Sequence, residues 1–398
     1  MKRNTTLGVI GVVATSVLVI ALGAAVLGNP AATPGPSSIA QASEPLLSPT
    51  PSPTSTPLPT PTPTPSPTPT PIPTPIMVPA PLTGRLVSPS VAAQHPIAVM
   101  IDDLGPARPQ SGLASASVVW QAPAEGGIPR YMAVFQDDLP AAVGPVRSSR
   151  YYYIAWAAEW RAVYIHAGGS PQALATLRSK GSGQLVYNGD EFRYSGTFFR
   201  LKTRFAPHNL YTTGAKLRSL GKRMGAKDQT YQSAWHFAPD APLESRPYGG
   251  TITVSYPYNL IKYRYDRTTN TYLRSVTREA KQTDAADGIR IAPQNVIVMR
   301  MKFGPLNDGH PGAPRLEATV VGSGPAWIST NGRTIKGTWK KTALTQPTRF
   351  YDAKGNEVTL TVGQTFVQVV PYSYPISFKA GTDQPPATST LSASPTAG

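Results

Sequence analysis

The sequence predicts an α+β fold, in which an N-terminal mixed α/β domain precedes an all-β C-terminal domain. Strand-like and helix-like segments alternate in the first half of the folded region, and only strand-like runs follow in the second half. Segments of low complexity flank this region on both sides. A membrane helix and a Pro/Thr-rich stalk are therefore expected to precede the two domains.

The N-terminal segment has the pattern of a membrane anchor. Lys2 and Arg3 precede an uncharged apolar run from Leu7 to Leu27, which is long enough to span a bilayer as a helix. We therefore expect residues 1–28 to form a short cytoplasmic N-terminus and a single-pass anchor, with the folded domains outside the cell membrane. A cleaved signal peptide is the alternative, because Ala40-Gln41-Ala42 has the small-x-small form of a cleavage site.

Residues 29–85 are expected to form a disordered stalk rich in Pro, Thr and Ser. From Pro49 to Pro81 the sequence alternates Pro with Thr or Ser, which favours an extended polyproline II conformation. At about 3.1 Å per residue, this stretch reaches on the order of 100 Å. Residues 380–398 have a similar composition and are expected to form a disordered tail.

The α/β domain is predicted over residues 86–240. Short apolar or β-branched runs bounded by turn residues predict strands at Pro96–Ile101, Ser117–Ala122, Arg130–Gln136 and Arg161–Ala167. A helix is expected from Ser149 to Trp160. A second helix is expected with Ser170 as N-cap, Pro171 at its first position and Gly181 at its end. A third helix fits the later run TTGAKLRSLGKRMG.

The all-β domain is predicted over residues 241–379. Its strand candidates are the runs TITVSYP, IKYRYD, TYLRSV, QNVIVMRMKF, RLEATVVG, PAWISTNGRTIKGTW, EVTLTVG and TFVQVVP. The pairs Asn331-Gly332 and Lys354-Gly355 are typical of the turns between strands.

The charge and the cysteine content narrow the classes of function. The chain has 37 Lys and Arg against 21 Asp and Glu, a net charge of +16, which favours anionic partners. Because the folded domains are expected outside the cell membrane, nucleic acid is not expected as a partner. The expected partner is an anionic envelope polymer, a lipid-linked precursor or a membrane headgroup. The chain has no cysteine, so disulfides, cysteine-bound zinc, thiol catalysis and a lipidated cysteine are excluded.

Arginines and glycines predict an anion site in the α/β domain. Arg147 and Arg150 lie at the start of an expected helix, where positive charge is unfavourable unless it meets carboxylates or a bound anion. Arg130 adds a third guanidinium, and the turn Gly168-Gly169-Ser170 leads into a helix whose first N–H groups favour anions. These six residues are the predicted ligand-binding set. The alternative is that the arginines pair with Glu125, Asp137, Asp138 or Glu159, and that the turn only caps a helix.

Two aspartates and two histidines are candidates for catalysis. Asp102 and Asp103 follow a strand, at the edge of the sheet where ligands gather in α/β proteins. Neighbouring strand residues point to opposite faces, so only one of them is expected to face a site, as a base or as a ligand of a divalent cation. His166 and His208 are the candidate partners in acid–base chemistry. No metal-binding or nucleophile motif is present, and no other cofactor is expected.

Several segments together resemble the YerB-like family of bacterial extracytoplasmic proteins. They are PIAVMIDDLGPARPQSGLASASVVWQAPAEGGIPRYMAVFQ, GPVRSSRYYYIAWAAEWRAVYIHAGGSPQA, PHNLYT, GSGPAWISTNGRTIKGTWKK and RFYDAKGNEVTLTVGQTFVQVVP. The resemblance covers Leu86 to Pro375 and implies an N-terminal and a C-terminal YerB domain at the cell surface. It implies no activity, because the family is known chiefly as a domain of unknown function. Its members are often lipoproteins, whereas in this chain we expect the apolar N-terminal helix to replace the lipid anchor.

Three hypotheses follow for the function. The first is a membrane-tethered envelope protein of bacteria that binds a phosphate- or carboxylate-bearing ligand through the six predicted residues. The second is a hydrolase or transferase that uses Asp102 or Asp103 with His166 or His208. The third is a scaffold for envelope proteins, with the all-β domain as its docking surface.

Overall fold

A single ten-stranded sheet joins the two halves of the sequence. The computed structural model describes residues 75–309 and 315–385. The order of the strands in this sheet is β19-β18-β17-β14-β21-β4-β5-β3-β6-β7. The first half of the chain contributes β3 (Ile97–Asp102), β4 (Val118–Pro123), β5 (Pro129–Phe135), β6 (Val163–His166) and β7 (Tyr187–Asp190). The second half contributes β14 (Asn295–Met301), β17 (Gly322–Thr330), β18 (Arg333–Lys341), β19 (Arg349–Tyr351) and β21 (Thr365–Pro371).

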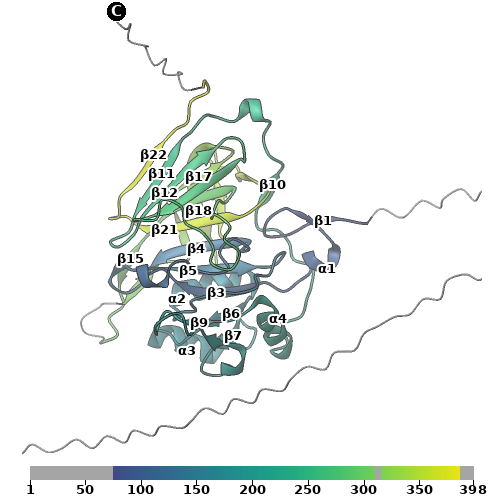
Figure 1. The fold of residues 1–398 in the computed structure, drawn as a ribbon, viewed down its shortest axis with the longest axis vertical. Coiled ribbons are helices and arrows are strands. Elements are labelled where there is room, and N and C mark those ends of the chain that lie inside the picture. The colour runs from purple at the N-terminus through teal and green to yellow at the C-terminus, as the bar shows by residue number, and fades with distance from the viewer. Residues whose placement is uncertain (1–74, 310–314, 386–398) are drawn as a thin grey trace, which may run out of the picture. The chain divides into compact units, whose positions relative to one another are not determined.

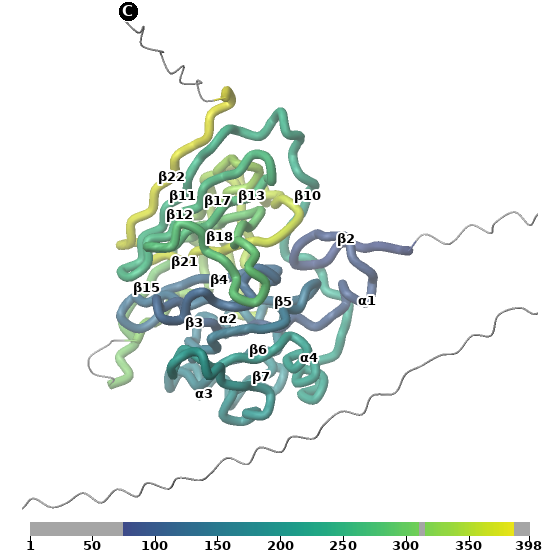
Figure 2. The backbone as a smooth tube through the Cα atoms, viewed as in Figure 1, coloured from purple at the N-terminus to yellow at the C-terminus, as the bar shows by residue number. Residues whose placement is uncertain are grey.

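Strand β21 makes the connection between the halves. It pairs in parallel with β14 on one side and with β4 on the other, so Phe366 lies opposite Val119. In Figure 2 the yellow-green β21 runs beside the blue β4, although about 250 residues separate them in the chain. The expected α/β and all-β domains therefore share one continuous sheet. The boundary placed at residue 240 stays a prediction.

The large sheet is buried on both faces. Ala98 and Met100 belong to a hydrophobic cluster on one face, and Ile97, Val99 and Ile101 belong to a cluster on the other. A strand covered on both sides needs apolar residues at consecutive positions, which explains the uninterrupted apolar run of β3.

Four α-helices lie in the described part of the chain, which is mostly β. They are α1 (Pro89–Ala92), α2 (Tyr151–Ala157), α3 (Pro171–Lys180) and α4 (Gly214–Arg223). Short 3-10 turns are found at η1 (Gly105–Ala107), η2 (Glu125–Gly127), η3 (Ala158–Trp160), η4 (Ser195–Thr197) and η5 (Leu243–Ser245). Helices α2 and α3 pack on one face of the large sheet and α4 on the other, as Figure 1 shows.

The helix boundaries confirm one prediction and correct another. The Ser170 hydroxyl accepts a hydrogen bond from Ala173 N, Pro171 opens α3 and Gly181 ends it, as expected. The helix expected from Ser149 instead begins at Tyr151, with Arg150 at the N-cap position. Arg147 and Arg150 therefore precede the helix in extended backbone, where they are not neighbours on one helical face.

A four-stranded antiparallel sheet covers the second face of the large sheet. Its order is β13 (Thr271–Val276), β12 (Leu260–Asp266), β11 (Thr251–Ser255) and β22 (Ile376–Lys379). Along β12 the residues alternate between exposed and buried, because only one face of this sheet meets the core. In Figure 1 its strands β11, β12 and β22 lie beside β17 and β18 of the large sheet.

Four short strand pairs complete the described fold. They are β1 (Val78–Pro79) with β2 (Leu86–Val87), β8 (Phe199–Arg200) with β9 (Leu210–Tyr211), β10 (His236–Ala238) with β20 (Thr359–Thr361), and β15 (Phe303–Pro305) with β16 (Leu316–Ala318). The β17–β18 hairpin turns at Asn331 and Gly332, whose φ values of 49° and 73° confirm the predicted turn.

The predicted N-terminal anchor lies outside the described residues, as do most of the stalk and most of the tail. Within residues 75–309 and 315–385, no helix is long and apolar enough to cross a membrane.

Candidate functional site

The candidate residues gather at one edge of the large sheet. Strands β3, β4, β6 and β7 run in the same direction and end there, and the antiparallel β5 begins there. We call this the carboxyl edge. Asp102 ends β3, His166 ends β6, and Arg130 lies opposite Asp102 in the pairing of β5 with β3. The topology therefore brings together residues that the sequence analysis selected separately.

An extended segment, residues 144–150, crosses the carboxyl edge. Asp102 N donates to Pro145 O (3.0 Å), and Ala167 N donates to Arg147 O (3.1 Å). Ser149 N donates to Gly168 O (2.9 Å), which places the two arginines of this segment beside the predicted glycine turn. The segment begins at Gly144, where a Cβ atom would lie 2.7 Å from the Tyr211 ring. Only glycine allows the backbone to approach β9 this closely.

Asp102 binds an arginine and a histidine at the same oxygen. Its Oδ2 lies 2.8 Å from Arg147 Nε and 2.7 Å from His208 Nδ1. Its Oδ1 accepts a hydrogen bond from Leu104 N (3.1 Å). The Asp102 side chain is 2% exposed, whereas those of Arg147 and His208 are 21% and 15% exposed. A buried carboxylate thus holds two partly exposed groups that face the solvent at the edge.

Glu125 binds three arginines. It follows β4 in the turn η2, and its carboxylate forms ion pairs with Arg130 (3.0 Å), with Arg150 and with Arg315 (3.9 Å). Arg130 also donates to Ser148 O (2.8 Å), and Arg315 pairs with Asp308 (2.6 Å). We call Arg130, Arg147, Arg150 and Arg315 the arginine cluster. The alternative prediction, that the arginines pair with carboxylates, is therefore confirmed for Glu125. The ion pair between Arg147 and Asp102 was not predicted.

Burial shifts the protonation equilibria of the three predicted arginines. Desolvation is the main cause that lowers the pKa of Arg130, Arg147 and Arg150, and nearby Asp102 only partly offsets it at Arg130 and Arg147. Arg150 Nε is buried and has no hydrogen-bond partner within the described part of the chain. The carboxylates present therefore compensate these cations incompletely.

The predicted glycine turn uses its backbone donors within the protein. Gly168 N donates to Asp190 Oδ1 (3.2 Å), and Ser170 N donates to Ser149 O (3.3 Å). The Ser170 hydroxyl caps α3. Gly168, Gly169 and Ser170 lie beside the arginines as expected, but at Gly168 and Ser170 the N–H groups bind protein acceptors.

The two candidate histidines differ in how many of their ring nitrogens have hydrogen-bond partners. His166 is fully buried, and its Nδ1 and Nε2 lie 2.8 Å from Gly168 O and 2.7 Å from Asn188 Oδ1. His208 uses only Nδ1, toward Asp102, and its Nε2 has no partner among the residues that the structure describes. His166 therefore supports the glycine turn, while His208 keeps a nitrogen for other chemistry.

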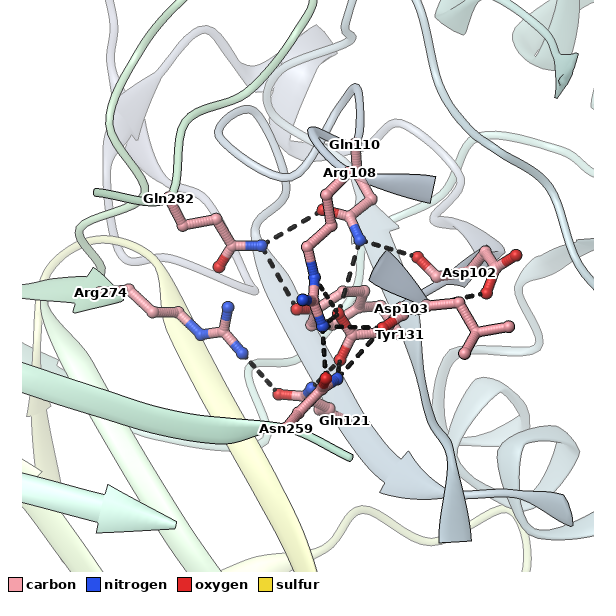
Figure 3. Close-up of polar contacts among 10 residues, drawn as sticks. Asp102, Asp103, Arg108, Gln110, Gln121, Tyr131, Asn259, Arg274 and Gln282 are labelled. Atoms are coloured by element: carbon pink, nitrogen blue, oxygen red, sulfur yellow. Dashed lines mark hydrogen bonds and ion pairs between the residues drawn. The ribbon is translucent and has the colours of Figure 1, made fainter. Parts of the chain in front are cut away.

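Asp103 points away from the arginine cluster, as the alternation of strand residues predicts. Figure 3 shows its carboxylate among side chains from both sheets. Arg108 lies 3.2 Å away, Asn259 Nδ2 donates to it at 2.8 Å, and Gln121 donates as well. Burial raises the pKa of Asp103, although Arg108 and Arg274 oppose this shift.

The network around Asp103 was missed in the sequence analysis. Its other members are Gln110, Tyr131, Arg274 and Gln282, all fully buried. Arg274 on β13 donates to Gln121 Oε1 (2.8 Å) on β4, which ties the four-stranded sheet to the large one. No local motif marks Arg274 and Gln282, because their contacts with Gln110, Gln121 and Tyr131 join positions more than 150 residues apart.

The carboxylates expected to hold a divalent cation are occupied by protein groups. Asp102 binds Arg147 and His208, and Asp103 binds Arg108, Gln121 and Asn259. No group of three His, Asp or Glu residues in the described ranges is arranged to hold a metal ion.

Two hollows lie elsewhere on the surface. One of about 690 Å³ is lined by apolar groups such as Leu86, Trp235 and Phe237, and one of about 460 Å³ lies beside Trp327 and Phe378. Neither is lined by a member of the arginine cluster.

Comparison with known proteins places the chain in a family. Residues 82–228 and 252–367 match the N-terminal and C-terminal domains of a protein family of unknown function, DUF3048. A Bacillus subtilis (strain 168) protein described as "Putative lipoprotein YerB" is 31% identical over 300 residues, covering 73% of this chain and 86% of the relative. The crystal structure of YerB from Bacillus subtilis matches with a TM-score of 0.66 and 26% identity, over 75% of this chain and 99% of that one. Because the family domains match more than half of the chain, this protein belongs to the YerB-like DUF3048 family.

Proposed function

We propose that this protein is a membrane-associated, extracytoplasmic envelope protein that binds an anionic ligand at the carboxyl edge. The description of the Bacillus relative as a lipoprotein supports a location at the membrane. This chain has no cysteine to carry a lipid, so its attachment rests on the apolar run Leu7–Leu27. The ligand carries phosphate or carboxylate groups and belongs to a wall polymer, a lipid-linked precursor or a headgroup.

The excess of cations in the arginine cluster carries this proposal. Its four arginines meet three carboxylates, Asp102, Glu125 and Asp308, which leaves one positive charge in excess. The terminal nitrogens of Arg147 have no partner within residues 75–309 and 315–385. A planar guanidinium with free donors is suited to bidentate binding of phosphate or carboxylate.

The lowered pKa values of the arginines support the same conclusion. A buried cation whose pKa falls is stabilised by any added anion, because the anion restores the interactions lost with water. The ligand has to compete with Glu125 and Asp102, which already neutralise part of the cluster. We therefore expect an affinity that depends strongly on salt concentration.

Thermal unfolding of the full chain in a non-ionic detergent tests the proposal. The anions added are inorganic phosphate, glycerol phosphate, a teichoic-acid fragment, a prenyl phosphate and acetate. Comparing them distinguishes phosphate ligands from carboxylate ligands, and polymers from lipids. An anion at about 100 times its dissociation constant adds roughly 2.7 kcal/mol to the free energy of unfolding. The expected result is a rise in melting temperature with at least one anion.

A matched pair of variants assigns the shift to the cluster. Arg147→Gln removes a partly exposed guanidinium of the cluster, and Arg178→Gln removes an exposed one on α3. The anion-dependent shift should fall in the first variant and persist in the second. Equal shifts in both variants, or no shift in the native protein with any anion, would overturn the proposal.

A further inference from the structure

The arrangement around His208 resembles that of a histidine prepared for acid–base chemistry. The residue precedes β9, and Leu210 O accepts a hydrogen bond from Val146 N (2.7 Å), which fixes the histidine loop beside Arg147. His208 N also donates to Phe205 O (2.9 Å). The backbone on both sides of the ring is therefore held by hydrogen bonds.

The contact with Asp102 sets the tautomer of the ring. An ionised carboxylate only accepts hydrogen bonds, so the proton of the neutral imidazole lies on Nδ1, 2.7 Å from Asp102 Oδ2. The lone pair is then on Nε2, which no described residue contacts. The neutral ring thus presents a base at the partly exposed side of the edge, oriented by a buried carboxylate.

No other histidine in the described ranges has this arrangement. His95 and His166 use both ring nitrogens in contacts with backbone or side-chain oxygens of the protein. His236 lies on the surface, 68% exposed, beside Glu357. Among the histidines that the structure describes, only His208 combines a buried carboxylate partner with a free ring nitrogen and a neighbouring member of the arginine cluster.

We propose that His208 is the general base of a phosphate-ester hydrolase, with Asp102 as its positioning residue and the arginine cluster as the phosphate site. This inference rests on the proposed anion binding and names a phosphate ester as the ligand. Guanidinium groups suit this substrate because charge on the phosphoryl oxygens must be stabilised during transfer.

The reaction needs no group beyond water and the residues named. Nε2 of His208 removes a proton from water as the water oxygen forms a bond to phosphorus. The bond between phosphorus and the ester oxygen breaks, and the leaving oxygen takes the proton from Nε2. The products are a free alcohol and the phosphate, and His208 returns to its neutral form. Arg147, which shares Asp102 Oδ2 with His208, holds the phosphoryl oxygens through its free nitrogens.

Hydrolysis of 4-nitrophenyl phosphate and of bis(4-nitrophenyl) phosphate by the full chain tests this inference. The two substrates separate monoester from diester activity. His208→Gln should reduce kcat about 100- to 10,000-fold, which is the usual contribution of a general base. His236→Gln, a surface histidine outside the site, should leave kcat unchanged.

Two further measurements keep the outcomes distinct. The phosphate-dependent shift in melting temperature should persist in His208→Gln, because the arginine cluster is intact in that variant. Asp102→Asn should reduce kcat and change the ¹⁵N chemical shifts of the His208 ring toward the other tautomer, an effect that a purely structural role would not produce.

Each result supports or overturns a stated claim. Turnover that is lost in His208→Gln and kept in His236→Gln supports the inference. Equal turnover in His208→Gln and the native protein overturns it. Anion binding without hydrolysis of either ester also overturns it, while the proposed binding function stands. A native protein that neither binds phosphate nor hydrolyses either ester overturns both.

Discussion

Replacing Glu125 by Gln should tighten anion binding and weaken folding at once. Glu125 neutralises part of the arginine cluster through contacts with Arg130, Arg150 and Arg315, so it competes with any anion that binds there. Gln keeps the shape and one acceptor oxygen but removes the charge. The cluster then carries two excess positive charges in place of one.

The size of the effect follows from Coulomb's law. An anion on the outer side of a guanidinium lies roughly 7 Å from Glu125. At that distance the repulsion between two unit negative charges is about 0.6 to 2.4 kcal/mol for a dielectric constant between about 80 and 20. The dissociation constant for phosphate should therefore fall about 3- to 60-fold. The free energy of unfolding should fall by about 1.5 to 3 kcal/mol, because hydrogen bonds to charged groups are lost.

Isothermal titration with phosphate and unfolding in urea measure the two effects. Glu357→Gln is the matched control, since Glu357 also binds an arginine but lies outside the cluster. It should leave the dissociation constant unchanged. An unchanged or larger dissociation constant in Glu125→Gln would refute the reasoning, because the charge of the cluster would then not govern binding.

Three other predictions concern the support of the site. Arg274→Met should lower the free energy of unfolding by about 3–5 kcal/mol in urea titrations, because it removes one member of a buried charged network; a loss below 1 kcal/mol would contradict this. The pKa of Asp103 is raised in the folded protein. The contribution of Asp103 to stability is therefore largest below pH 3.8, the ordinary pKa of an aspartate, and is lost as the pH rises through the folded-state pKa. The native protein should therefore lose stability relative to Asp103→Asn as the pH rises above 3.8, and a difference in stability that does not depend on pH would exclude this linkage. Gly144→Ala should lower both the melting temperature and the affinity for phosphate, whereas Gly105→Ala, which has open space around it, should change neither.

Local features were predictable because short stretches of chain decide them. The N-cap at Ser170, the end at Gly181 and the turn at Asn331-Gly332 each depend on the conformational preferences of a few residues. Strands β3, β4, β5 and β6 were predicted within about two residues for the same reason, whereas β7 was not predicted. The start of α2 was placed too early, because hydrogen bonds to β3 and to the turn after β6 hold the preceding segment extended, and no local pattern reveals them.

The members of the candidate site were predictable in kind but not in their pairing. The sequence places Asp102 directly after a predicted strand and makes His208 a candidate for acid–base chemistry, yet 106 residues separate them. The choice between His166 and His208 depends on whether Asn188 or Asp102 lies beside the ring, which is decided by strand order. Arg315 belongs to the second half of the chain, and no motif around it indicated that it is part of the site.

The sequence by itself determined the caps, the turns, the apolar strands, the charge and the family of this protein, because each depends on neighbouring residues or on matched motifs. The tertiary structure decided that β21 joins the two halves in one sheet, that Asp102 orients His208 and that Glu125 binds three arginines. These contacts form between distant segments, and their energies depend on distance and burial, which only the folded chain defines.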